Sequence, residues 1–188
     1  MALPQEKIYT LEDIYALPDG ERAELIDGRI YNMAPPNRIH QKISWKLHQT
    51  IANYITSKQG NCEVYAAPFS VFLNKDDKNY VEPDISVICD KNKLDDKGCV
   101  GAPDWIIEIT SPLNPETDYG VKLYKYRTAG VREYWIVNPL KHVVIVYDFE
   151  HEKLTNLYSF EDTIPVCIYE DLNICIADLL ETVEYKDS

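Results

Sequence analysis

A glutamate lies inside the most apolar short stretch of this chain, "APDWIIEITSP" at residues 102–112. The central part, from Trp105 to Ile109, has the composition of a buried β-strand, and the Ser-Pro pair that follows predicts the strand end. A strand this apolar is expected to be covered on both faces, where an unpaired carboxylate costs roughly several kcal/mol. The fold must therefore supply Glu108 with a cationic partner or a metal ion.

The order of apolar patterns predicts one α/β (α+β) domain spanning residues 1–188, with a mixed β-sheet flanked by helices. The chain has 188 residues, 45% of them hydrophobic, which is enough for one well-packed core. Besides the Glu108 strand, strand patterns occupy residues 62–73, 84–90, 131–139, 142–149, 153–160 and 163–169. Helical patterns occupy residues 10–17, 37–60, 115–130 and 176–183, although Gly120 weakens the first turn of the third.

Residues 21–33 predict a β-hairpin. Asp27-Gly28 stands between two strand-like runs, and this dipeptide favours a two-residue hairpin loop. In that register Glu24 lies opposite Tyr31, on the same face as Ile26 and Arg29.

The longest predicted helix, residues 37–60, is amphipathic and ends at Lys58-Gln-Gly60. Its buried stripe follows helical spacing and consists of Ile39, Ile43, Leu47, Ile51, Tyr54 and Ile55. The same helix carries His40 and His48, whose spacing favours a solvated or groove-lining face over a pair of metal ligands. We expect the three tryptophans to lie in the core or at its edge: Trp45, Trp105 and Trp135.

Composition restricts the cellular setting. There are five cysteines without any CxxC spacing, which predicts reduced thiols rather than a disulfide framework or a zinc site. No apolar run approaches the ~20 residues of a membrane span, and the first residues lack the apolar segment of a secretory signal, so a cytoplasmic protein is expected. The net charge of −12 argues against coating nucleic acid by bulk electrostatics, but it allows an enzyme that binds a phosphodiester through metal ions.

Asp84 is the candidate partner of Glu108 in a metal site. It precedes the apolar run "ISVIC", and neighbouring strands could bring the two carboxylates together. Two acids in a low-dielectric site repel each other, whereas Mg²⁺ accepts one or two carboxylates and keeps several waters. Lys122, on the following helix, could point back to the same place and neutralise developing charge, and Tyr126 lies one helical turn further on the same face.

Each of these residues also has an ordinary structural interpretation. Asp84 after Pro83 fits a turn, and Glu108 fits a structural ion pair with a lysine or arginine. Lys122 fits a solvated helix position, and Glu24 fits a surface charge on a hairpin. Sequence patterns of P-loop, dinucleotide-binding, zinc-protease and serine-hydrolase sites are absent from the sequence.

Several motifs taken together resemble a known family. Pro83-Asp84 followed by Glu108-Ile-Thr110 resembles the PD-(D/E)XK signature of the restriction-endonuclease-like superfamily. The longer series "ELIDGRI", "EPDISVI", "APDWIIEITSP" and "GVREYWIVNP" is similar to the Uma-type endonuclease family, from about Tyr9 to about Leu180. This resemblance implies a restriction-endonuclease-like core with a mixed sheet.

The resemblance also implies roles for individual residues. Asp84 and Glu108 match the metal-binding acids, and the carbonyl of Ile109 would be a further ligand. Thr110 stands where the superfamily usually has lysine, and Lys122 on the next helix fits the displaced lysine. Glu24 matches an early acid near the metal, and His40 a recurring histidine of the long helix.

The sequence therefore predicts a Mg²⁺-dependent endonuclease, with Mn²⁺ as a substitute and nucleic acid, DNA first, as substrate. The predicted catalytic set is Asp84, Glu108, Lys122 and Glu24, with Lys122 helping to position and deprotonate water, while His40 and Tyr126 are expected to contact substrate. Two alternatives stay open: a catalytically silent nuclease-fold binding module, and a metal-free glycosidase with two separated carboxylates. Because one modest acidic cleft holds a duplex poorly, we expect a homodimer.

Overall fold

The computed structural model describes residues 7–111, 117–153 and 155–181. Their central feature is a six-stranded sheet with the strand order β11-β10-β9-β8-β5-β3. Only the β8–β9 pair is parallel within this sheet, so the predicted mixed sheet is confirmed. The strands are β3 (Glu63–Ala66), β5 (Ile85–Ile88), β8 (Trp105–Ile109), β9 (Glu133–Asn138), β10 (Val143–Asp148) and β11 (Asn156–Ser159).

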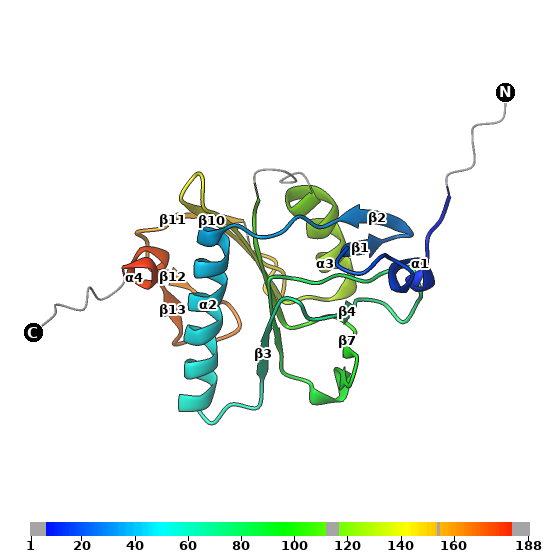
Figure 1. The fold of residues 1–188 in the computed structure, drawn as a ribbon. Coiled ribbons are helices and arrows are strands. Elements are labelled where there is room, and N and C mark those ends of the chain that lie inside the picture. Colours follow the sequence, from blue (N-terminus) through cyan, green and yellow to red (C-terminus); the bar gives the residue numbers. More distant parts are fainter. Residues whose placement is uncertain (1–6, 112–116, 154, 182–188) are drawn as a thin grey trace, which may run out of the picture.

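The helix α2 (Arg38–Ser57) covers one face of this sheet, as Figure 1 shows. Asn37 caps it by accepting a hydrogen bond from the backbone N–H of His40 at 2.9 Å. Its buried residues recur every four positions: Ile43, Leu47, Ile51 and Ile55. In one core cluster they pack against Trp105, Ile107 and Ile109 of β8. Burial of each such side chain contributes about 1.5–3 kcal/mol, which fixes this helix on the sheet.

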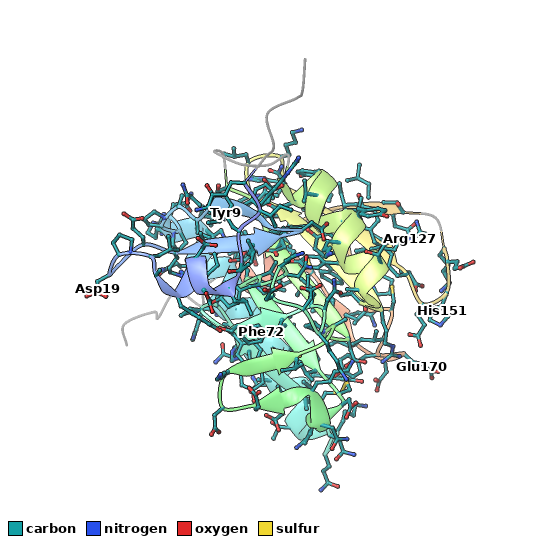
Figure 2. All side chains as sticks on the ribbon, turned by 90° about the vertical axis from the view of Figure 1, so that its right-hand side faces the viewer. Tyr9, Asp19, Phe72, Arg127, His151 and Glu170 are labelled. Carbon is teal, nitrogen blue, oxygen red and sulfur yellow. A yellow bond between two sulfur atoms is a disulfide. The ribbon has the colours of Figure 1, made fainter. Side chains whose placement is uncertain are left out.

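The opposite face is covered by α3 (Leu123–Ala129), by the hairpin of β1 (Ala23–Ile26) and β2 (Arg29–Asn32), and by a small second sheet (Figure 1). That sheet has the order β4-β7-β6, with β4 (Val71–Phe72), β6 (Leu94–Asp95) and β7 (Gly98–Val100). Figure 2 turns this side to the viewer and labels Phe72 of β4 and Arg127 of α3. Since side chains alternate along a strand, Ile106 and Glu108 of β8 point to this face.

The shorter elements lie at both ends of the chain. The helix α1 (Leu11–Tyr15) begins with a capping box of Thr10 and Asp13. Near the other end, β12 (Ile164–Pro165) pairs with β13 (Asn173–Ile174), and α4 (Ile176–Leu180) packs beside α2. Within the described ranges, no helix combines the length and the apolar character that crossing a membrane requires.

The hairpin prediction is confirmed in its register. Glu24 is the strand partner of Tyr31, and Ile26 is the partner of Arg29. Asp27 and Gly28 both have positive φ values, 50° and 76°, as a tight loop of this kind requires. Glu24 is thereby held on a buried strand, although a surface charge was the ordinary expectation.

Other predictions need correction. The run 62–73 is not one strand, because β3 joins the central sheet and β4 joins the small one. Residues 117–122 form a π-helix, η2 (Thr117–Lys122), before α3, so the described part of the predicted helix 115–130 does not begin as a regular α-helix. A 3₁₀ turn, η1 (Lys91–Lys93), leads into β6.

Two predictions about cysteine and tryptophan are wrong in part. Cys62 and Cys89 form a disulfide, so five reduced thiols are not found. Their pairing follows from the sheet, since Glu63 is the register partner of Ile88 and the cysteines are one step further along. Trp105 and Trp135 are fully buried, but Trp45 is 57% exposed and does not belong to the core.

Candidate active site

A cavity of about 450 Å³ opens where the carboxyl end of β8 meets the start of β5. This volume lies in the range of small-molecule and cofactor sites. Its wall combines side chains from α2, the hairpin, both strand ends and η2. The predicted site residues that line it are Glu24, His40, Asp84, Glu108, Ile109 and Lys122.

The sheet register brings Asp84 and Glu108 together. Ile85 of β5 is the antiparallel partner of Ile107 of β8, so the next step of the register places Asp84 beside Glu108. The Asp84 carboxylate accepts a hydrogen bond from the backbone N–H of Ile109 at 2.7 Å, which anchors it at the strand end. The pairing predicted from two apolar runs is therefore present in the structure.

Lys122 lies at the centre of a group of carboxylates. Its Nζ is 2.7 Å from Glu24 Oε2, 3.0 Å from Glu108 Oε1 and 3.6 Å from Asp118 Oδ1. The Lys122 side chain is only 6% exposed, and those of Glu24 and Glu108 are 4% and 5% exposed. One ammonium therefore serves three acids that come from β1, β8 and its own helix.

Two further contacts fix these acids. The second oxygen of Glu24, Oε1, accepts the backbone N–H of Glu82 at 3.0 Å. Tyr126 donates its hydroxyl to Glu108 Oε1 at 2.6 Å. Because Tyr126 is 0% exposed, it supports Glu108 from behind, and the substrate contact expected for it is not supported.

His40 approaches the site from α2, on the other side of the sheet end. Its Nε2 lies 3.1 Å from Asp84 Oδ2. Burial acts to lower the pKa of His40, but the hydrogen bond and charge of Asp84, together with the Ile109 backbone, outweigh it and raise the pKa. The imidazole is therefore a donor to the Asp84 carboxylate, while its Nδ1 is buried without a partner among the described residues.

The acids and the lysine shift one another's ionisation. Burial raises the pKa of Glu108 well above its ordinary value; Lys122 opposes this shift, and the charges of Asp118, Asp84 and Glu24 add to it. Burial likewise raises the pKa of Asp118 to about 6, against the effect of Lys122. For Lys122 burial favours the neutral amine, but Glu108, Glu24 and Asp118 outweigh it and raise its pKa well above the ordinary value.

Asp118 was missed as a site residue in the sequence. It lines the same cavity and lies four positions before Lys122, a spacing that brings helical side chains together. That spacing was the available signal, but Gly120 between the two residues made a helical turn there uncertain.

Comparison with known proteins places the chain in a family. The sequence profile of Uma2, described as "Putative restriction endonuclease", matches residues 10–173. The chain belongs to the Uma2 family. This confirms the resemblance seen in the sequence motifs, and the family description indicates a nuclease.

Two proteins similar to this Uma2 chain come from cyanobacteria. One is "Uncharacterized protein slr1290" of Synechocystis sp., which is 27% identical over 128 residues; the match covers 68% of this chain and 66% of that protein. The other is the crystal structure of a "putative nuclease" from Anabaena variabilis ATCC 29413. It superposes with a TM-score of 0.72 at 24% identity, over 90% of this chain and 96% of that chain, and so shares the fold.

The Uma2 site can be tested for its fit to a divalent metal. In the part of the chain that is described, no three His, Cys, Asp or Glu side chains are arranged to hold an ion by themselves. Mg²⁺ needs fewer, because it binds through one or two carboxylates and retains its waters. Five carboxylates line the cavity with two cations, Arg22 and Lys122: Glu24, Glu82, Asp84, Glu108 and Asp118. This excess of hard oxygen donors and negative charge fits a divalent cation.

Proposed function

We propose that this protein is a divalent-metal-dependent endonuclease that hydrolyses phosphodiester bonds, with DNA as the first substrate to test. One observation carries the proposal: Asp84 and Glu108 converge at paired strand ends in one cavity, with the buried ammonium of Lys122 3.0 Å from Glu108. The family description supports the reaction class. Mg²⁺, or Mn²⁺ in its place, is the proposed cofactor.

The residues proposed to hold the cation are Asp84 and Glu108 through their carboxylates and Ile109 through its backbone carbonyl. All three line the cavity. A cation held there would supply Lewis-acid stabilisation of charge on a phosphoryl oxygen and would acidify water. The protein's part is to orient the two carboxylates, which the Ile109 N–H does for Asp84 and the Tyr126 hydroxyl does for Glu108.

Lys122 is proposed to act as a fixed positive charge. Its raised pKa keeps it an ammonium, so it can donate hydrogen bonds and offset charge on a phosphate oxygen, but it does not remove a proton from water. This changes one expectation from the sequence, in which Lys122 also helped to deprotonate the nucleophile. A fixed cation whose side chain is only 6% exposed stabilises developing negative charge more strongly than it would in water.

Asp118 is the better candidate for proton transfer. It lines the cavity, and its pKa of about 6 lies near neutral pH, where a general base works most effectively. Its carboxylate is 3.6 Å from Lys122, which can hold it in place. We propose that Asp118 accepts the proton of the attacking water.

The test is a cleavage panel of plasmid DNA, single-stranded DNA and RNA with Mg²⁺, Mn²⁺ or EDTA. We expect cleavage with either metal, none in EDTA, and none in Asp84→Ala. Lys122→Ala should lose cleavage while still binding the metal, and Lys125→Ala, one turn away on α3 and paired with Asp27 instead, is the matched control.

The outcomes separate the rival functions. Wild-type turnover in Lys122→Ala would remove the role given to this lysine. If the folded wild-type protein cleaves none of the substrates with any metal, the silent binding module is the better explanation. Activity that persists in EDTA on a glycoside substrate would favour the carboxylate-pair glycosidase, against which the ammonium between the acids argues.

A further inference from the structure

An exposed tryptophan lines the same cavity as the acids. Trp45 of α2 is 57% exposed, whereas Trp105 and Trp135 are 0% exposed. It belongs to the cavity wall together with Gln41, Ser44 and His48 of the same helix face. A large ring left in water beside a polar site is an unusual use of tryptophan, because such rings are normally buried or bound to a partner.

The position of Trp45 on α2 explains why it cannot join the core. The buried stripe contains Ile43 and Leu47, two positions before and after it, so Trp45 points away from the sheet. The ammonium of Lys46 lies 5.1 Å from the centre of its ring. An aromatic ring with a cation beside it offers both a stacking surface and a charge for an adjacent phosphate.

The charge of α2 differs from that of the whole chain. Asp and Glu account for 31 of the 188 residues, and the net charge is −12. Yet α2, with 20 residues, contains none of them. It carries five basic side chains, Arg38, His40, Lys42, Lys46 and His48. Lys42 donates a hydrogen bond to the backbone carbonyl of Leu180. Among the lysines and arginine of α2, this leaves Arg38 and Lys46 as candidates for phosphate contacts.

We propose that α2 is the wall of the cavity that binds nucleic acid, and that the indole of Trp45 stacks on an unpaired base next to the phosphate to be cleaved. The substrate class is therefore single-stranded nucleic acid, or a duplex with an unpaired nucleotide. This inference rests on the proposed nuclease function, whose acids lie in the same cavity.

The requirement for an unpaired base follows from geometry. Within a duplex both faces of each base are covered by its neighbours, so an indole reaches a base face only after that base leaves the stack. Proteins that bind single strands use this arrangement of aromatic rings beside a basic track. An acid-free helix in an acidic protein supplies such a track locally, without the basic surface needed to hold a long duplex.

Intrinsic fluorescence tests the proposal without any need for cleavage. Since Trp105 and Trp135 are buried, acrylamide should quench mainly Trp45 in the free protein. A single-stranded oligonucleotide added in EDTA should quench the same emission, and a blunt duplex of the same sequence should do so much less. Trp45→Ala should weaken single-strand binding by about 10-fold or more, and Trp45→Phe should retain most of it.

The control is Tyr124→Ala, which removes another exposed aromatic ring, 70% exposed on α3, and should leave binding unchanged. The inference is overturned if single strands do not quench the emission, if duplex quenches it equally, or if Trp45→Ala binds normally. Weak acrylamide quenching that strengthens on dilution would also overturn it, since Trp45 would then lie in a contact between copies of the chain. Normal metal-dependent cleavage by Trp45→Ala refutes only this inference, whereas intact stacking without any cleavage refutes only the nuclease proposal.

Discussion

Replacing Lys122 by methionine should destabilise the metal-free protein strongly at pH 8 and much less at pH 5. The ammonium of Lys122 lies 2.7 Å from Glu24, 3.0 Å from Glu108 and 3.6 Å from Asp118. Methionine has nearly the same length but no charge, so the cavity keeps its packing while the buried Glu24 and Glu108 and the partly buried Asp118 lose their counter-ion. Removing one partner of a buried ion pair costs about 3–5 kcal/mol, and we expect a loss of that size at pH 8.

The pH dependence has a definite sign. In the wild type the pKa of Lys122 is raised, so its stabilising effect is present below its ordinary pKa of 10.5 and is lost only at higher pH. In Lys122→Met two carboxyl pKa values should rise further: that of Glu108, which is already raised in the wild type, and that of Asp118, which is about 6 in the wild type. Acids with raised pKa values bind more protons in the folded state, so the variant loses stability as pH rises through those values. At pH 5 they are largely protonated, and most of the penalty should disappear.

Urea unfolding of both proteins in EDTA at pH 5 and pH 8 measures this difference. Lys125→Met is the control, because Lys125 on the same helix pairs with Asp27, whose side chain is 63% exposed. Its loss should be smaller than that of Lys122→Met and nearly independent of pH between 5 and 8, because the exposed Asp27 carboxylate stays solvated without its partner. An equal penalty for Lys122→Met at both pH values would refute the view that buried carboxylates, rather than lost packing, cause the instability.

Three further predictions concern the site and the assembly. In EDTA at pH 8, Glu108→Gln should melt at or above the wild-type temperature, because the raised pKa of Glu108 means that its ionised form lowers the stability of the folded state. Adding Mg²⁺ or Mn²⁺ should no longer raise the Tm of this variant. A much lower melting temperature would identify Glu108 as a structural ion-pair partner instead. Asp118→Asn should remove the rise of the cleavage rate through about pH 6 and slow the reaction by about 10²-fold or more, and an unchanged rate profile would exclude Asp118 as the base. We predict a homodimer, so light scattering that gives the 21.7 kDa mass of one chain at micromolar concentration would contradict it.

The parts of the site that were predictable are those set by local patterns. Asp27-Gly28 fixes a hairpin register from two residues, and this register places Glu24. Asp84 and Glu108 each border or interrupt an apolar run, and two such runs of the right length favour neighbouring strands. The buried stripe of α2 follows from helical spacing except at Ile39, which was predicted to be buried but is 36% exposed. In each case the information lies within about twenty residues of the chain.

The parts that were missed depend on pairings far apart in sequence or on irregular backbone. Cys62 and Cys89 meet only because β3 pairs with β5 in one particular register, which composition and spacing do not specify. Asp118 reaches Lys122 through a π-helical turn that no simple periodicity predicts. Trp45 is left outside the core because its neighbours Ile43 and Leu47 occupy the sheet-facing side of the helix, a detail that the strong burial preference of tryptophan conceals.

The placement of the lysine shows how one electrostatic arrangement can be reached from different elements. Side chains alternate along a strand, so a residue two positions after Glu108, at position 110, would point to the same face of the sheet as Glu108. This chain has Thr110 there. A lysine there would approach the acids along the strand. Lys122 instead comes from the helical segment packed over that face and brings its ammonium to 3.0 Å from Glu108. What the proposed chemistry requires is a cation at that point in space. The helix route adds Asp118 one turn away, which a lysine at position 110 would not bring with it.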